Sequence, residues 1–313
     1  MRPRASAATS ATSAMAAIVC LGLCEVGCLS GAALDARVAE AKASAEALET
    51  IADIDVARAG FEAQLAELEG LHRVAPGSDD ALFALVRGWT VYGATFLADA
   101  REEAADAGDL AAVRALRFRE LHALERAIGF GVHALGRRGG DLEGSRRTRE
   151  TLAAWAAERL TRPSDAELAF WVGHAFAARG RLVAGDPDAR RLGPFAGQVL
   201  LERSHRLAPG YARYGALREL SLALGESPSG VDEARRNLDL VLERTGRRAL
   251  TVLVEYALGP ACRRPDAPLT ERLLTEVLAA TDPGIDDRLA NAFAKRRARR
   301  ALARAPDRRC PAP

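Results

Sequence analysis

A succession of helix-like segments, separated by glycine and proline residues, runs from about Asp35 to about Arg304. The segment that begins at Ser78 carries apolar residues such as Leu85 and Trp89 at spacings of three and four, which places them on one face of a helix. The alternation of apolar and polar residues that marks a half-buried strand is nearly absent. Alanine and leucine, which favour helices, dominate the chain. We therefore predict an all-α fold.

The glycine and proline breaks divide the chain into individual helices. We expect helices over residues 78–107 and 109–135, a short helix around Leu152 and Trp155, a helix that opens at Ser164, and further helices over residues 194–207, 211–224, 231–245, 248–258, 269–280 and 286–304. Ser164 and Glu167 have the spacing of a capping box at a helix start. The stretch Leu250–Val254 resembles a strand, but its flanks are helical, so we expect a helix there.

A short internal repeat indicates how the helices pack. Residues 72–77 (His-Arg-Val-Ala-Pro-Gly) recur as residues 205–210 (His-Arg-Leu-Ala-Pro-Gly). The offset is close to four units of about 34 residues, the tetratricopeptide period. One helix pair cannot bury its apolar face alone, so such pairs stack and share a core. The sequence thus predicts a tetratricopeptide-like α-solenoid of stacked antiparallel helix pairs, with a helical repeat domain over residues 35–305.

The amino-terminal residues have the features of an export signal. Arg2 and Arg4 precede the apolar run Ala14–Cys24, which is too short to span a bilayer but suits the apolar core of a secretory signal. Cys28 follows Gly27, as at the cleavage site of a bacterial lipoprotein. We therefore expect a signal peptide over residues 1–27, a lipidated Cys28 that attaches the chain to a membrane, and a short tether over residues 28–34.

Two alternatives to lipidation remain open, because Glu25 stands where a lipoprotein signal has leucine. Ordinary cleavage near Ala32 or Ala33 would release a soluble secreted protein. An uncleaved anchor over Ala14–Leu34 would keep the chain in the membrane. The amino-terminal features thus lead us to expect an exported protein.

Two cysteines remain outside the export signal and are candidates for a disulfide. Cys262 lies in a break between helices, and Cys310 lies in the expected carboxy-terminal tail, residues 306–313. Exported compartments permit disulfide formation. Cys20 and Cys24, which share a helical spacing with Cys28, belong to the signal, so we expect no metal site there.

The residues indicate no catalytic chemistry. The chain has no phosphate-binding loop, dinucleotide-binding fingerprint, zinc-protease motif or nucleophile elbow. Lysine and arginine total 44 against 42 aspartate and glutamate, a balance that argues against a nucleic-acid partner. We expect the basic run of residues 295–300 to be a solvated helix face, with a patch for nucleic acid or anionic lipid as the alternative. We expect no enzyme activity, no cofactor and no metal.

Four stretches have the order and spacing of segments in one protein family. They are residues 88–96 (Gly-Trp-Thr-Val-Tyr-Gly-Ala-Thr-Phe), the pair Phe170-Trp171, residues 246–257, and residues 288–298, which are near a terminal L-A-N-x-x-A-x-x-R-A pattern. Over residues 71–302, the chain resembles the TatT family, the T component associated with TRAP transporters. Members of this family are periplasmic, usually lipid-anchored proteins of tetratricopeptide type.

The resemblance implies an accessory role in solute import. It implies that the protein docks a substrate-binding (P) component and passes a small ligand through a helix-lined cavity; a homo-oligomer is a further candidate assembly. A general envelope scaffold without a ligand is the alternative. The aromatic residues are either core or cavity lining, and the stretch of residues 288–298 offers partner or structural candidates. The cavity candidates are Trp89, Tyr92, Phe96, Phe170 and Trp171, and the partner or structural candidates are Asn291, Arg296 and Arg297.

Overall fold

The computed structural model describes residue 33, residues 35–184, 195–263, 266–281 and 284–305, and residue 310. Within these residues the chain forms helices and turns and contains no strand, so the all-α fold is confirmed. The stretch Leu250–Val254 is helical, as expected. The signal peptide with its cleavage site, Cys28, most of the tether and most of the tail lie outside the described residues.

A first helix covers residues 35–49 and is followed by sixteen labelled elements in the described part of the chain. The first half continues with α2 (Ile54–Val74), α3 (Asp79–Val91), the π-helical turn η1 (Tyr92–Leu97), α4 (Ala98–Asp106), α5 (Leu110–Gly136), α6 (Leu142–Ser145), α7 (Arg149–Arg159) and α8 (Pro163–Leu182). The second half contains α9 (Phe195–Leu207), α10 (Tyr211–Gly225), α11 (Val231–Arg244), α12 (Leu250–Leu258), α13 (Pro260–Arg263), α14 (Ala267–Ala279), the 3-10 turn η3 (Ile285–Asp287) and α15 (Arg288–Ala303).

The start of α8 differs from the expected capping box. Pro163 occupies the first helical position, where its missing N–H costs nothing. The carboxylate of Asp165 accepts the backbone N–H of Arg162 at 2.9 Å, so it satisfies the helix start from within the first turn. Ser164 therefore lies inside the first turn, and the predicted pairing of Ser164 with Glu167 is wrong.

The repeated hexapeptides occupy equivalent local positions. Each ends a helix, α2 in the first copy and α9 in the second, and a new helix opens shortly after it. The backbone N–H of Ala75 donates to the carbonyl of Leu71 at 2.8 Å, and that of Ala208 donates to Ser204 at 2.9 Å. The repeat therefore encodes the same helix–turn–helix connection twice.

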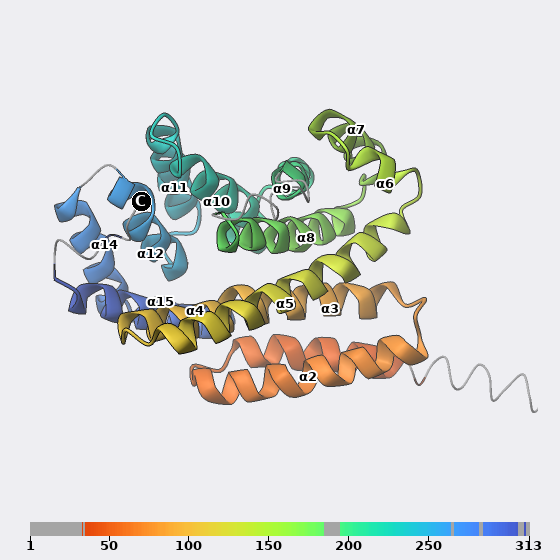
Figure 1. Cartoon of the computed structure of the whole chain (residues 1–313), viewed down its shortest axis with the longest axis horizontal. Coiled ribbons are helices and arrows are strands. Elements are labelled where there is room, and N and C mark those ends of the chain that lie inside the picture. The colour runs from red at the N-terminus through yellow and green to blue at the C-terminus, as the bar shows by residue number, and fades with distance from the viewer. Residues whose placement is uncertain are drawn as a thin grey trace, which may run out of the picture.

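Successive helices pack side by side and bury a continuous series of apolar clusters (Figure 1). In Figure 1, α2 lies along one edge, α3 and α5 lie next to it, and α8 to α11 lie beyond α5. The helices α8 and α9 approach each other closely, where Gly173 faces Gly197. A Cβ atom at either glycine would come within 3.1 Å of the other helix's backbone, so the two glycines permit this packing distance.

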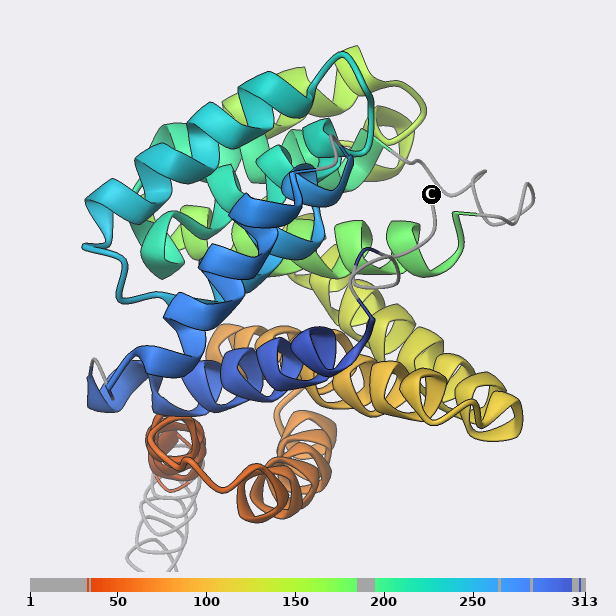
Figure 2. The same ribbon diagram turned by 90° about the vertical axis from the view of Figure 1, so that its left-hand side faces the viewer.

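The last helix returns to the beginning of the helical body. Figure 2 shows α15 in dark blue beside the yellow α4 and above the orange helices, and α15 contacts both α2 and α4. Leu289 and Phe293 of α15 share a cluster with Phe61 of α2 and Phe96 of η1. In a solenoid each unit contacts only its neighbours. The open solenoid form is therefore not confirmed, because the stack closes on itself.

The elements α3, η1 and α4 form one continuous helix, Asp79–Asp106. Among the described residues this helix is long and apolar enough to cross a membrane, but half of its most apolar window is buried inside the protein. It contacts α2, α5 and α8. These contacts identify it as a core helix of the closed stack.

Candidate functional site

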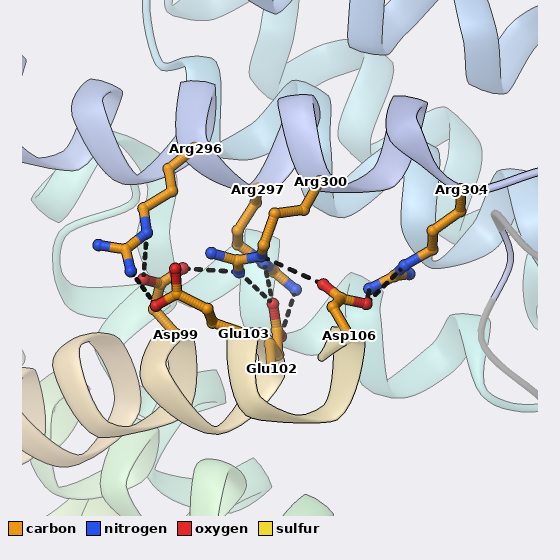
Figure 3. A network of polar contacts seen from close by, with 8 residues as sticks. All are labelled: Asp99, Glu102, Glu103, Asp106, Arg296, Arg297, Arg300 and Arg304. Carbon is orange, nitrogen blue, oxygen red and sulfur yellow. Dashed lines mark hydrogen bonds and ion pairs between the residues drawn. The ribbon is translucent and has the colours of Figure 1, made fainter. Parts of the chain in front are cut away.

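The junction between α4 and α15 is made by charged side chains (Figure 3). Both sets recur at spacings of three and four, so each lies on one face of its helix. The acidic residues are Asp99, Glu102, Glu103 and Asp106, and the arginines are Arg296, Arg297, Arg300 and Arg304. We call these eight residues the α4–α15 clamp.

Asp99 is the most buried member of the clamp, with 3% of its surface exposed. Its Oδ2 is 3.2 Å from Nε of Arg296, and its Oδ1 is 2.7 Å from Nη2 of Arg300. Arg297 donates two hydrogen bonds of 2.8 Å to Glu102. For Arg296, Arg297 and Arg300 the predicted solvated face is therefore wrong, because these arginines of the basic run pair with α4.

Asn291 also acts between helices. Its Oδ1 accepts the backbone N–H of Leu250 at 3.2 Å, and both groups are buried. Leu250 is the first residue of α12, whose N-cap residue, Ala249, has no side chain that could serve this N–H. Asn291 of α15 thus supplies the missing cap of α12. The structure places Asn291, Arg296 and Arg297 in positions that hold helices together.

A buried carboxylate joins α8 to α10. Glu219 is 2% exposed and lies 3.1 Å from Nδ1 of His174, 2.9 Å from Nη1 of Arg181 and 3.2 Å from Nη2 of Arg218. Burial favours a raised pKa for Glu219, but His174, Arg181 and Arg218 outweigh it and hold the pKa well below its usual range. Glu219 is therefore ionised, and it ties the two helices together.

Charged and aromatic side chains from five elements meet where the first helix, α3, α8, α10 and η3 come together. The residues are Glu49, Arg87, Trp171, Tyr211, Arg213 and Asp287, which we call the seam cluster. Arg87 pairs with Glu49, and its guanidinium lies 5.6 Å from the centre of the Trp171 ring. The indole N–H of Trp171 donates to the hydroxyl of Tyr211 at 2.9 Å.

Burial changes the acid–base properties of the seam cluster. It raises the pKa of Tyr211 to about 12, so this phenol is neutral throughout the physiological range. Burial also raises the pKa of Glu49, although the neighbouring Arg87 opposes the shift. The cluster therefore combines aromatic faces, a neutral hydroxyl and a partly buried ion pair, which suits a small ligand with both apolar and polar groups.

The backbone beside Tyr211 is strained. Ala212, Arg213 and Tyr214 have φ values of 49°, 57° and 62°, in the left-handed region that costs about 1–2 kcal/mol per residue. The guanidinium of Arg213 lies 2.7 Å from the carboxylate of Asp287, which holds this turn against η3. Strain of this kind concentrates at functional sites. The turn could not be predicted from the sequence, because its one local signal is the preceding break at Pro209-Gly210.

The five aromatic cavity candidates lie in two clusters. Trp89, Tyr92 and Phe96 pack with α2 and α15, and Phe96 is completely buried. Phe170 and Trp171 pack instead with α9 and α10. Trp171 alone among the five belongs to the seam cluster. Tyr92, Phe96 and Phe170 are buried in the core, and Trp89 is partly buried against it.

Two hollows occur in the described part of the protein. A cavity of about 20 Å³ lies between the first helix, α2 and α3, beside Glu49 and Arg87, and has room for about one water molecule. A wide hollow of about 570 Å³ lies on the outer face of α14, where Pro268 and Arg272 line it. None of the five aromatic candidates lines either hollow.

Cys262 and Cys310 form a disulfide at the pair that the sequence predicts, with the Cα atoms 5.3 Å apart. The bond ties residue 310 to the break between α12 and α14. In the described residues no group of three or more histidine, cysteine, aspartate or glutamate side chains is arranged to hold a metal ion. Cys28, the predicted lipidation site, lies outside the described residues.

Comparison with known proteins places this architecture in a family. A family model described as the TRAP transporter T-component matches residues 50–308, which is most of the chain. The matched region includes the whole α4–α15 clamp and every residue of the seam cluster except Glu49. No curated protein matches the chain.

Proposed function

The chain belongs to the TRAP transporter T-component family, and from this premise we propose that it is an exported, lipid-anchored accessory protein that docks the substrate-binding component of a TRAP-type solute import system. The family match covers the helical body from α2 to α15 and supports the accessory role. The export signal and Cys28 support a membrane-anchored location in the periplasm. The proposed role is non-enzymatic.

We further propose that the seam cluster is where a small ligand is held or passed. The observation that carries this proposal is the meeting of Trp171, Tyr211 and the Arg87–Glu49 pair beside a strained turn. Aromatic faces with a few convergent polar groups are the usual lining of a ligand site. Because the adjoining cavity is small, a ligand would enter by displacing the seam side chains rather than by filling an existing space.

Mass spectrometry of co-purified small molecules tests the seam. Trp171→Phe removes the N–H that Tyr211 accepts and should lower the amount of bound molecule relative to the wild-type chain. Trp155→Phe is the matched control, because Trp155 donates to the carbonyl of Gly139 on a different part of the stack. A ligand retained equally by both variants would contradict the seam proposal.

A general envelope scaffold without a ligand is the second candidate. The observation that favours it is the core packing of Phe96 and Phe170, together with the finding that none of the five aromatic candidates lines either hollow. If the protein is a scaffold, it should capture a substrate-binding component, and no small molecule should co-purify with either protein. The import role predicts both the capture of this component and a co-purified small molecule.

Membrane fractionation tests the anchor. If Cys28 is lipidated, this one acylated cysteine holds the protein at the membrane surface. Cys28→Ala should then move the protein to the soluble fraction. Cys24→Ala, inside the expected signal, is the control and should leave the mature protein in the membrane fraction. If the Cys28→Ala chain stays in the membrane and is not cleaved, the anchor is the uncleaved amino-terminal segment and not a lipid.

A further inference from the structure

The outer face of α5 exposes apolar side chains beside cations. Leu110 and Phe118 are 68% and 64% exposed, although both are large apolar residues. Leu110, Arg114, Phe118 and His122 are spaced four residues apart, so they form one continuous row along the helix. We call this row the outer ridge of α5. The ring of Phe118 lies 4.3 Å from that of His122.

The charge of the outer ridge is positive and uncompensated. Arg114 lies between the two exposed apolar residues and makes no hydrogen bond or ion pair with any residue that the structure describes. The acidic residues next to the ridge are engaged elsewhere: Asp109 caps the start of α5, Glu120 is buried and pairs with Arg101 at 2.7 Å, and Glu125 pairs with Arg179 at 3.1 Å. A partner that covers the outer ridge must therefore bring acidic groups to Arg114 and an apolar contact to Phe118.

The position of the outer ridge favours a protein partner over the membrane that holds the tether. Arg37, near the start of the first helix, pairs with Glu67 near the end of α2, and α3 starts directly after α2. The continuous helix Asp79–Asp106 has 28 residues, about 42 Å at 1.5 Å per residue. It carries the α4–α5 turn to the opposite end of the molecule in Figure 1. A tether of seven residues spans at most about 25 Å, which is less than the length of this helix.

We propose that the outer ridge of α5 is the docking surface for an acidic protein partner, the substrate-binding component, with Phe118 as the apolar anchor and Arg114 as the charged contact. This inference rests on the proposed docking function. Aromatic and arginine side chains are the residues that most often dominate binding at protein interfaces. The neighbouring Ala111 and Ala115 are exposed and small, so they let a partner approach the helix closely.

Binding of the purified substrate-binding component to the full-length mature chain tests this surface. Arg114→Glu and Phe118→Ala should each weaken the dissociation constant by about tenfold or more, and rising salt should weaken wild-type binding more than that of Arg114→Glu. The controls are Arg236→Glu on α11, an exposed arginine, and Val74→Ala on α2, which is 75% exposed. Both should stay within about twofold of wild type.

The outcomes separate the two proposals. Wild-type binding that neither ridge variant changes overturns the outer ridge as the docking surface and leaves the docking function standing. No wild-type binding overturns the docking function and this surface with it. Ridge-dependent binding to phosphatidylglycerol vesicles, or ridge-dependent self-association in sedimentation, without binding to the component would assign the surface to a membrane or a second copy and overturn the proposal. Thermal melting confirms that each variant is folded, and photo-crosslinking from position 118 identifies the partner independently of affinity.

Discussion

The side chain of Asn291 completes a helix to which it does not belong. Helix starts leave backbone N–H groups without partners, and a side chain within the same helix usually satisfies one of them. In α12 the N-cap position is Ala249, so the acceptor comes from α15, which is 41 residues away in sequence. One buried amide therefore links the last helix to the start of α12.

Replacement of Asn291 by alanine should destabilise the protein. The buried N–H of Leu250 would lose its acceptor, and the free energy of unfolding should fall by about 1–3 kcal/mol. Urea denaturation measures the change. Asn237→Ala on α11 is the control, because that amide is partly exposed, and its effect should stay within about 0.5 kcal/mol. Equal effects of the two substitutions would contradict the capping role.

Among the helices, α10 is unusual because it begins with residues in the left-handed backbone conformation. The residues are Ala212, Arg213 and Tyr214, and none of them is a glycine. The next residue, Gly215, faces Phe170 so closely that a Cβ atom would lie 2.7 Å from that ring. Packing of Phe170 and the Arg213–Asp287 pair together hold the turn in this conformation.

Ala212→Gly should relieve part of the strain. Glycine adopts positive φ without a steric cost, and after its greater loss of entropy on folding the free energy of unfolding should rise by up to about 1 kcal/mol. Ala223→Gly, at an exposed right-handed position of α10, should lower it by about 1 kcal/mol. Thermal unfolding compares the two variants. A loss of stability in both would show that the turn is not strained.

For the whole molecule, closure depends on links between segments far apart in sequence. The α4–α15 clamp joins residues about 200 positions apart, and the disulfide joins the break after α12 to residue 310. An open repeat array has no such links, because its units contact only their neighbours. The clamp and the disulfide therefore distinguish this protein from the solenoid that its helix pattern predicts.

Removal of the buried carboxylate should weaken the closure strongly. Asp99→Ala leaves Arg296 and Arg300 without their buried partner, so the free energy of unfolding should fall by about 3–5 kcal/mol. Glu103→Ala removes an exposed clamp residue and should cost about 1 kcal/mol or less. Chemical denaturation at equal salt measures both. A small effect of Asp99→Ala would mean that the clamp adds little to closure.

Reduction of the disulfide should lower stability without abolishing the fold. Its two cysteines are separated by 48 positions, and opening a loop of this size frees unfolded-chain entropy worth roughly 4 kcal/mol. The Cys262→Ser, Cys310→Ser double variant should match the reduced wild type in its unfolding midpoint. Two free thiols titrated at these positions in the native, oxidised protein would contradict the bond.

Local sequence signals predict most of the helices, the breaks between them and the candidate disulfide pair. Periodicity of apolar residues, helix propensity, and glycine and proline act over a few neighbouring residues, so they can be recognised without knowledge of the partner segment. The spacing of the arginines in α15 was equally visible. The structural role of these arginines could not be predicted, because no local pattern identifies α4 as the partner of Arg297 or Arg300.

The closure of the stack, the clamp and the seam cluster are visible only in the folded protein. Each depends on which helix faces which, and that choice follows from the summed packing of many side chains rather than from any one motif. Trp171 was a candidate from sequence, whereas Tyr211, Arg213 and Asp287 were not, because no local pattern places residues from α8, α10 and η3 together. The left-handed turn at Ala212 exists for the same reason: contacts with Phe170 and Asp287 outweigh the local preference of the backbone.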